Sequence, residues 1–155
     1  MMMYHAWDSQ NAWLRQIISQ NFLHMNADRA AELKLKDFDW VWVESHNGKI
    51  RCQLKTMHGC ERNTVWTWNA IGKMAKAWGL ESEAAEATHG FLLNHLISES
   101  LPQRSGEEST TNSDPITGQA AWYDLKVRIT KAAPGETGTW PKLEFGSGAK
   151  IGAAK

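Results

Sequence analysis

The fold is decided by the stretch Trp40-Val41-Trp42-Val43-Glu44-Ser45-His46-Asn47-Gly48-Lys49-Ile50-Arg51-Cys52-Gln53-Leu54-Lys55. Two runs rich in strand-forming residues flank an Asn-Gly pair, which is the strongest short-range signal for a β-hairpin. Such a pair is typical of a tight turn in which both residues take positive φ. The sequence therefore predicts a hairpin with strands over residues 40–44 and 50–55.

The two strands of this hairpin differ in their side-chain pattern. In the second strand the apolar residues Ile50, Cys52 and Leu54 alternate with polar ones, which predicts one buried face and one wet face. In the first strand Trp alternates with Val, so both faces are apolar. This pattern favours a strand inside a closed or two-layered sheet.

The rest of the chain predicts short elements around the hairpin. Helical spacing of apolar residues indicates short helices over 13–18, 27–36 and 91–97, the second capped by Asn26, and residues 81–87 are helix-prone. Short strands are expected over 65–68 and 121–129, with Val127 and Ile129 on one face of the latter. We expect a mainly β domain with short helices over residues 1–131 and a flexible Gly/Ala/Lys-rich tail over 132–155.

Composition excludes several classes of function. The chain has 155 residues, which fits one domain, and its 17 Lys and Arg balance its 17 Asp and Glu. A zero net charge argues against a nucleic-acid partner, and no apolar run is long enough for membrane insertion. No secretory signal is visible at the start, which predicts a cytoplasmic protein. Two cysteines, Cys52 and Cys60, are too few for an iron–sulfur cluster within this chain.

Motifs for catalysis are missing, and three polar loops remain. No CxxC, HExxH, GxSxG, GxGxxG or Walker A pattern occurs, so no metal site or catalytic residue is predicted. Residues 7–11, 67–73 and 112–119 mix Asn, Gln, Asp or Ser with Gly or Trp. Such side chains can read the edges of a nitrogen heterocycle, and Gly72-Lys73 could contact a pyrophosphate. By composition alone these segments are ordinary surface loops.

The three loops and the segments between them carry a family resemblance. The matching runs are Trp7-Asp8-Ser9-Gln10-Asn11-Ala12-Trp13-Leu14, Met25-Asn26 with Ala30-Ala31-Glu32-Leu33, Asp39-Trp40-Val41-Trp42-Val43-Glu44-Ser45 with Gly48-Lys49-Ile50-Arg51, Thr67-Trp68-Asn69-Ala70-Ile71-Gly72-Lys73, Gly90-Phe91-Leu92-Leu93-Asn94-His95-Leu96-Ile97, and the run from Asn112 to Asp124 that contains Asp114-Pro115-Ile116-Thr117-Gly118-Gln119. Over residues 4–131 the chain resembles the C-terminal dinucleotide-binding domain of molybdopterin oxidoreductases, the dimethyl-sulfoxide-reductase superfamily. The Asn69, Asn94 and Asp114 blocks resemble the branch that includes sulfite dehydrogenases and thiosulfate or polysulfide reductases.

The resemblance implies a six-stranded double-psi β-barrel that binds molybdopterin guanine dinucleotide. It places Trp7, Ser9 and Gln10 in the first cofactor loop, and Asn69, Gly72 and Lys73 near phosphate or pterin. It further implies that polar edges of the cofactor are bound by Asn94, Asn112 and Gln119, and that Asp114 pairs with the N1–H and N2–H of guanine.

The resemblance also implies what this chain would need from elsewhere. Catalytic subunits of the family are several times longer, and other domains hold the iron–sulfur motif and the molybdenum ligand. The family's first barrel strand precedes the loop that contains Trp7, so we expect the barrel to lack that strand. The chain would then be a split or truncated part of an oxidoreductase, without a complete active site of its own. Its partners would be an iron–sulfur electron-transfer subunit and the remaining domains of the catalytic subunit. The alternatives are a stand-alone non-catalytic binding or assembly module and a truncated gene product.

Overall fold

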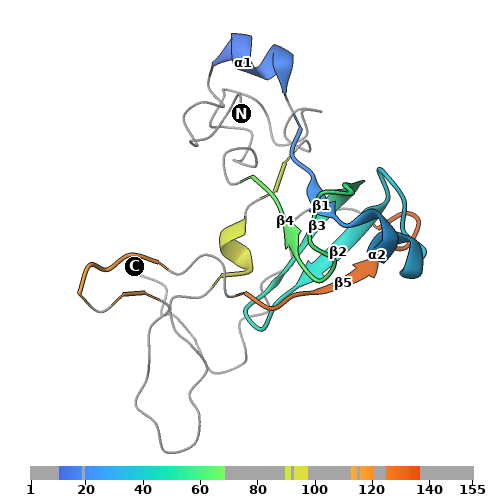
Figure 1. Cartoon of the computed structure of the whole chain (residues 1–155). Helices are drawn as coiled ribbons and strands as arrows, with labels where there is room; N and C mark the ends of the chain where they lie inside the picture. Colours follow the sequence, from blue (N-terminus) through green and yellow to red (C-terminus); the bar gives the residue numbers. More distant parts are fainter. Residues whose placement is uncertain are drawn as a thin grey trace, which may run out of the picture.

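The predicted hairpin forms the centre of the fold (Figure 1). In the computed structural model, β2 (Trp40–Glu44) pairs antiparallel with β3 (Lys49–Thr56), in a register that runs from Trp40↔Gln53 to Glu44↔Lys49. The structure describes residues 11–18, 20–68, 90–91, 93–97, 113–114, 116–120 and 125–136. The hairpin is confirmed, with its second strand one residue longer at each end than predicted.

The turn of the hairpin differs from the prediction. Among the described residues, positive φ occurs at Lys34, Phe38, Gly118 and Gly135, and so not at Asn47 or Gly48. The turn is instead a four-residue loop in which the Ser45 hydroxyl oxygen accepts hydrogen bonds from the backbone N–H groups of Asn47 (3.1 Å) and Gly48 (3.2 Å). The predicted turn type was wrong because the Ser45 side chain supplies the acceptor that organises this loop.

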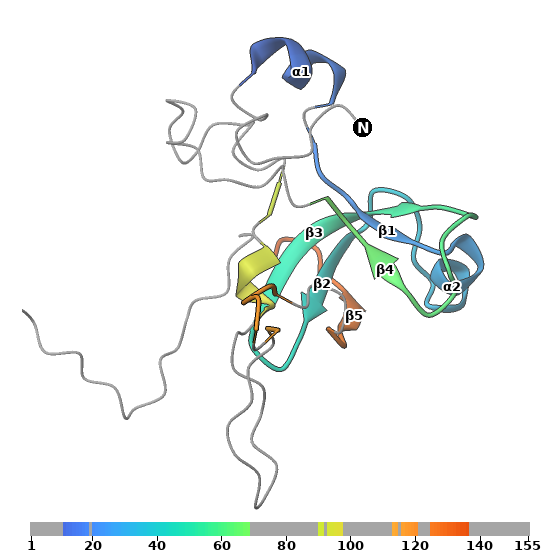
Figure 2. The ribbon, with the colours of Figure 1, turned by 60° about the vertical axis from the view of Figure 1, so that its left-hand side comes forward.

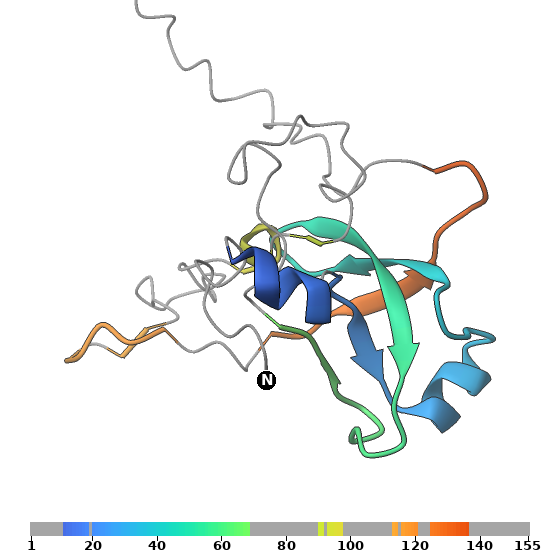
Figure 3. The same ribbon diagram turned by 90° about the horizontal axis from the view of Figure 1, so that it is seen from above.

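Five strands form one sheet, in the order β4-β1-β3-β2-β5. The last three residues of β3 pair in parallel with β1 (Leu23–Met25), which in turn pairs antiparallel with β4 (Val65–Trp66). On the other side β2 pairs antiparallel with β5 (Arg128–Lys131). β3 therefore belongs to both halves of the sheet, and it bends strongly between them (Figures 2 and 3). The prediction of a mainly β domain with short helices is confirmed.

For three of these strands the observed residues can be compared with the predicted ones. β4 lies within the predicted strand over 65–68. β5 begins at Arg128, whereas a strand was predicted from residue 121; residues 125–127 are not in a strand, and 121–124 lie outside the described residues. β1 was not predicted, because three residues are too few to show a period-2 pattern.

Two short α-helices precede the hairpin. In α1 (Ala12–Ile17) the Asn11 side chain caps the first turn, but Trp13 and Ile17 on the predicted apolar face are 77% and 59% exposed. In α2 (Ala27–Glu32) Asn26 is the N-cap, as predicted. This helix ends earlier than predicted because Lys34 takes a left-handed conformation, with φ of 56°. The predicted helix over 91–97 is seen as the short 3-10 helix η4 (Leu93–His95), and residues 81–87 lie outside the described residues.

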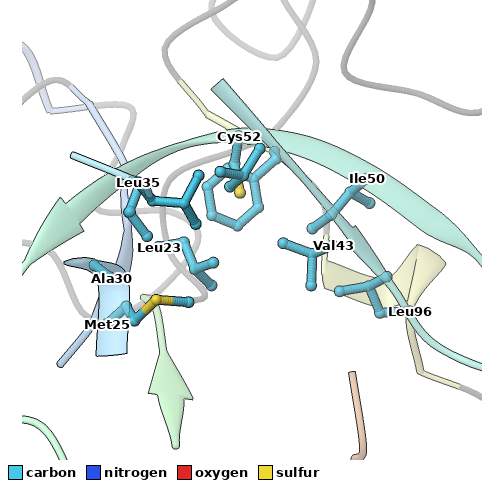
Figure 4. Packing of buried hydrophobic residues seen from close by; sticks show 11 residues of the cluster. Leu23, Met25, Ala30, Leu35, Val43, Ile50, Cys52 and Leu96 are labelled. Atoms are coloured by element: carbon cyan, nitrogen blue, oxygen red, sulfur yellow. The ribbon is translucent and has the colours of Figure 1, made fainter. Parts of the chain in front are cut away.

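The core lies on the concave side of the curved sheet (Figure 4). Val41 and Val43 of β2 and Ile50, Cys52 and Leu54 of β3 are almost completely buried there. Around them pack side chains from β1, from α2 and its following turn, and from the segment at η4: Leu23, Met25, Ala30, Leu35, Phe91 and Leu96. The predicted alternation of β3 is thus confirmed.

The opposite face of β2 is only half-buried. Its Trp40 and Trp42 rings lie beneath cationic side chains of β3, with Arg51 4.0 Å from the Trp40 centroid and Lys49 4.4 Å from that of Trp42. Both faces of β2 carry apolar residues, as predicted, and among the described residues Lys49 and Arg51 cover the second face through cation–π contacts. No helix within the described ranges is long and apolar enough to cross a membrane.

Candidate functional site

The structure describes three of the ten predicted cofactor-binding residues. Asp114 and Gln119 share one loop, whereas Asn94 lies on η4, and Figures 1 and 3 show the two segments apart. All three side chains are exposed. The other seven lie outside the described residues: Trp7, Ser9, Gln10, Asn69, Gly72, Lys73 and Asn112.

The loop that contains Asp114 is closed by its own hydrogen bonds. An isolated bridge pairs Ser113 with Ala120, and the backbone N–H of Asp114 donates to the carbonyl of Gln119 at 2.8 Å. The N–H of Gly118 donates to the carbonyl of Asp114 at 2.8 Å, and Gly118 takes a φ of 70°, which favours glycine. The loop is therefore a compact turn in which the backbones of Asp114 and Gln119 face each other and are joined by a hydrogen bond.

The Asp114 carboxylate is itself part of this turn. Its Oδ1 accepts hydrogen bonds from the backbone N–H of Thr117 (2.7 Å), the N–H of Ile116 (2.9 Å) and the Thr117 hydroxyl (3.0 Å). These donors lower the pKa of Asp114 below its ordinary value. An anionic carboxylate with one oxygen committed to the loop presents Oδ2 to a ligand, whereas the predicted pairing with two guanine N–H groups needs both oxygens or a rearranged loop.

Asn94 is held in place by the hairpin. The Ser45 hydroxyl donates to the carbonyl of Leu96 at 2.6 Å, and Asn47 Nδ2 donates to the carbonyls of His95 (3.3 Å) and Ile97 (3.1 Å). The side chains of the 45–48 turn thus fix the backbone on the C-terminal side of Asn94. Sequence reasoning assigned Asn47 to turn geometry and missed this anchoring role.

The start of the predicted loop 67–73 is fixed by a buried amide. Asn21 is 2% exposed, and its Nδ2 donates to the carbonyl of Trp68 at 2.6 Å. Its Oδ1 accepts hydrogen bonds from the Thr67 hydroxyl and the Phe22 N–H, both at 3.0 Å. Beside it the Trp66 ring stacks on His24, with centroids 4.1 Å apart, and meets the Trp68 ring edge-on at 4.8 Å. Asn69 directly follows this anchored segment.

Sequence reasoning also missed Asn21. A single Asn between Gln20 and Phe22 carries no local signal, because its partners are 46 and 47 residues away in the sequence. Asn11, the last residue of the predicted first loop, is the N-cap of α1: its Oδ1 accepts hydrogen bonds from the N–H groups of Trp13 (2.9 Å) and Leu14 (3.3 Å).

Neither cysteine has the properties of a metal ligand. Burial raises the pKa of the Cys52 thiol to about 12, and burial with the neighbouring Glu61 raises that of Cys60. Among the described residues, no group of three or more His, Cys, Asp and Glu side chains could hold a metal ion.

The described site residues fit a heterocyclic dinucleotide by their chemistry. Asp114 offers a carboxylate oxygen to ring N–H donors, and the exposed amides of Asn94 and Gln119 offer both donors and acceptors. Guanine and pterin present the same mixture of N–H donors and carbonyl acceptors.

Comparison with known proteins agrees with this chemistry. The profile of the family described as "Molydopterin dinucleotide binding domain" matches residues 2–113. The chain is 57% identical to a sulfite dehydrogenase subunit of Allochromatium vinosum over 136 residues, which are 88% of this chain and 14% of that protein. It is 25% identical to "Dopamine dehydroxylase" of Eggerthella lenta over 134 residues, 84% of this chain and 11% of that protein.

A solved structure supports the fold. "Acetylene Hydratase from Pelobacter acetylenicus" matches with a TM-score of 0.51 and 18% identity, over 77% of this chain and 15% of that chain. At this identity the likeness concerns the fold alone. Because the family profile covers most of the chain, the chain belongs to the molybdopterin dinucleotide-binding domain family, and its cofactor is molybdopterin guanine dinucleotide.

Proposed function

We propose that this chain is the cofactor-binding, C-terminal portion of a molybdenum oxidoreductase that acts on a sulfur oxyanion or a similar small substrate. The observation that carries the proposal is the 57% identity to a sulfite dehydrogenase subunit over 88% of the chain. The chain spans 14% of that relative's length, so the substrate site and the molybdenum ligand would lie in the remaining domains.

In this role the chain binds and orients the cofactor and takes no part in the redox step. The bound cofactor supplies the electron-transfer chemistry through its molybdenum. The residues proposed to bind it are those of the predicted loops: Trp7, Ser9, Gln10, Asn69, Gly72, Lys73, Asn94, Asn112, Asp114 and Gln119. Asn21 fixes Trp68, the residue before Asn69, and the loop that contains Asp114 is fixed by its own hydrogen bonds. Binding residues that are already held in place lose less conformational entropy when a ligand binds.

The finer architecture belongs to the same proposal. We infer a double-psi β-barrel over residues 1–131 and a Gly/Ala/Lys-rich tail over 132–155. The curvature of β3 and the mixed parallel and antiparallel pairing support a barrel. At the boundary the N–H of Ala132 donates to the Trp40 carbonyl at 2.8 Å, and Glu136 accepts a hydrogen bond from Trp42 Nε1 at 2.8 Å. The proposed partners, in the cytoplasm, are an iron–sulfur subunit and the rest of the catalytic subunit.

Calorimetric titration of the purified chain with guanosine diphosphate tests the cofactor site. We expect saturable binding, weakened about tenfold or more by Asp114→Ala, which removes both the charge and the acceptor of the turn. The matched control is Asp28→Ala, which removes an exposed carboxylate from the first turn of α2.

A second variant separates the two roles of Asp114. Asp114→Asn keeps an oxygen that can accept from Ile116 and Thr117 but removes the negative charge. Weakened binding by Asp114→Asn would support direct contact with guanine, whereas unchanged binding would leave Asp114 as a loop anchor only. No binding by a chain that circular dichroism shows to be folded would contradict the cofactor site on the isolated chain.

A further inference from the structure

The face of the hairpin away from the core carries two rows of side chains. Trp40 and Trp42 form a row on β2, and Lys49 and Arg51 form a row beside it on the paired strand β3. The rows touch through cation–π contacts, with Arg51 4.0 Å from the Trp40 centroid and Lys49 4.4 Å from that of Trp42. Both rings remain half-buried, so part of each is open to a further contact. We call these four residues the two-row face.

The chain arrives at this face directly after β5. The N–H of Ala132 donates to the Trp40 carbonyl at 2.8 Å. Glu136 Oε2 accepts hydrogen bonds from Trp42 Nε1 (2.8 Å) and from the Ala133 N–H (2.6 Å). Glu136 is also the last described residue. The segment that follows it therefore starts at the edge of the two-row face.

The two-row face keeps a surplus of positive charge. Glu44, which follows the Trp row on β2, pairs with Arg128 of β5 at 3.8 Å. Within the described ranges neither Lys49 nor Arg51 makes an ion pair, and Arg51 Nε is buried without a hydrogen-bond partner. The charges of both act on the Glu136 carboxylate. Because three cations thus meet two carboxylates here, a further carboxylate would be attracted to this face.

The segment that follows Glu136 has a pattern that matches the two rows. Residues 137–145 read Thr-Gly-Thr-Trp-Pro-Lys-Leu-Glu-Phe and lie outside the described residues. Leu143 and Phe145 flank Glu144, which is the only acidic residue between 137 and 155. Alternate residues of an extended segment point to opposite sides. A segment that lies along the boundary between the rows would therefore place apolar side chains over one row and the carboxylate over the other.

We propose that residues 137–145 bind to the two-row face: Leu143 and Phe145 cover the Trp row, and Glu144 pairs with Arg51. The apolar contacts remove the exposed parts of the Trp rings from water, which is favourable in proportion to the area covered. The ion pair supplies the carboxylate that the cationic row lacks. This contact goes beyond cofactor binding and does not depend on the proposed function.

The segment is long enough to take this position. Residues 137–144 span up to roughly 26 Å when extended, whereas the two rows lie on paired strands about 5 Å apart. Because Glu136 is hydrogen-bonded to Trp42, the segment is also tethered beside the face. Its effective concentration there is therefore high, and a modest number of contacts is enough to hold it.

Photocross-linking in the full 155-residue chain tests this contact. A benzoylphenylalanine in place of Phe145 keeps an aromatic ring and forms a covalent bond to its neighbours on illumination, and mass spectrometry locates that bond. We expect intramolecular products at residues 40–42 and 49–51. The matched control carries the same group in place of Ile151, outside the patterned segment, and should give little product at those residues.

Charge reversal tests the ion pair separately. Glu144→Lys should lower the yield from position 145 about two- to fivefold, which is what one exposed ion pair contributes. Arg51→Glu in the same chain should restore the yield, because the pair is rebuilt with opposite signs. Ser147→Lys adds a positive charge just outside the segment and should leave the yield unchanged. Glu144→Lys alters no residue of the sheet, so its result holds even if Arg51→Glu unfolds the hairpin.

Several outcomes would overturn the proposal. Products spread evenly over the chain, or equal products from positions 145 and 151, would show that the segment does not bind at the two-row face. A yield that Glu144→Lys leaves unchanged would contradict the pairing with Arg51. Products between two copies of the chain, in a share that rises with concentration, would show that the face binds the segment of another copy instead. The guanosine diphosphate titration is independent of all these results, so the two proposals can fail separately.

Discussion

Gly48 packs directly against the backbone of His95. A Cβ at position 48 would overlap the His95 carbonyl oxygen and lie 3.2 Å from its carbonyl carbon. This contact brings the turn of the hairpin against the segment that carries Asn94. Glycine is required at position 48 because there is no space for a Cβ, and not because of its backbone conformation, since Gly48 does not take a positive φ.

We therefore expect Gly48→Ala to destabilise the fold by about 1–3 kcal/mol, since the added methyl group must push backbone atoms apart. The free energy of unfolding in urea measures the effect. Gly59→Ala is the matched control, because its Cβ would meet only the end of the Met57 side chain at 3.8 Å. Equal stabilities of the two variants would contradict the packing explanation.

Asn47 makes the second connection between the hairpin and this segment. Its Nδ2 donates to the carbonyls of His95 and Ile97, so Asn47→Ala should cost about 1–2 kcal/mol of stability. Asn47→Asp tests the cause: it keeps the shape of the side chain but cannot donate when ionised, and it should be at least as destabilising as Ala. An Asp variant as stable as the original chain would rule out hydrogen-bond donation as the source.

The Asn47-Gly48 pair shows how far sequence reasoning reaches. The pair correctly predicted the position of the hairpin, because alternating strand formers on both sides leave little choice of register. It did not predict the turn conformation, because the side chains of Ser45 and Asn47 and the missing Cβ of Gly48 all serve contacts to a segment about 50 residues away. Contacts at that separation leave no periodic trace in the local sequence.

The candidate site was likewise only partly predictable from the sequence. The polarity of the 112–119 segment predicted a functional loop, but not that Asp114 Oδ1 is occupied by its own turn. The apolar spacing of Trp13 and Ile17 predicted a helix, but not that both side chains are exposed in this chain. Asn21 gave no signal at all, since a buried amide is recognised only once its partners are known. Local elements such as α1 were thus predictable, and their tertiary surroundings were not.

Asp39 should make stability depend on pH in the acid range. Its Oδ2 accepts from Lys131 Nζ at 2.8 Å and from the N–H of Lys36 at 3.0 Å, and these donors lower the pKa of Asp39 below its ordinary value of 3.8. A lowered pKa in the folded state gives stability that is present above the unfolded pKa and lost as pH falls through the folded pKa. Asp39→Asn should therefore cost about 1 kcal/mol at pH 7 and nothing once the carboxylate is protonated.

Urea titrations at several pH values between neutral and strongly acidic would measure this difference. Arg128→Gln is a suitable control, because it removes the long and exposed pair with Glu44, for which we expect little change. A cost of Asp39→Asn that stays constant down to the acid limit would show that the ion pair with Lys131 contributes nothing.

Cys52 should be inert in the folded chain. It lies in the middle of β3 with 1% exposure, and burial raises the pKa of its thiol from 9.0 to about 12. At pH 8 a disulfide reagent should leave Cys52 unmodified until denaturant is added, because the thiolate is the reacting species. A raised pKa also means that this residue's contribution to stability is complete below about pH 9 and declines as pH rises toward 12. Rapid labelling of Cys52 under native conditions would show that β3 opens readily.

Asn21 links the core of the sheet to the predicted cofactor loop that begins after Trp68. Asn21→Ala leaves the Trp68 carbonyl and the Thr67 hydroxyl without this partner, and we expect a loss of about 1–3 kcal/mol in stability. We also expect weaker guanosine diphosphate binding, because Trp68, which precedes the 69–73 segment, loses its hydrogen bond to Asn21. Thr67→Val is the matched control, since it removes only the hydroxyl bond and keeps the bond to Trp68. If the Asn21→Ala chain is less stable but binds guanosine diphosphate as tightly as the Thr67→Val chain, the hydrogen bond from Asn21 to Trp68 plays no part in cofactor binding.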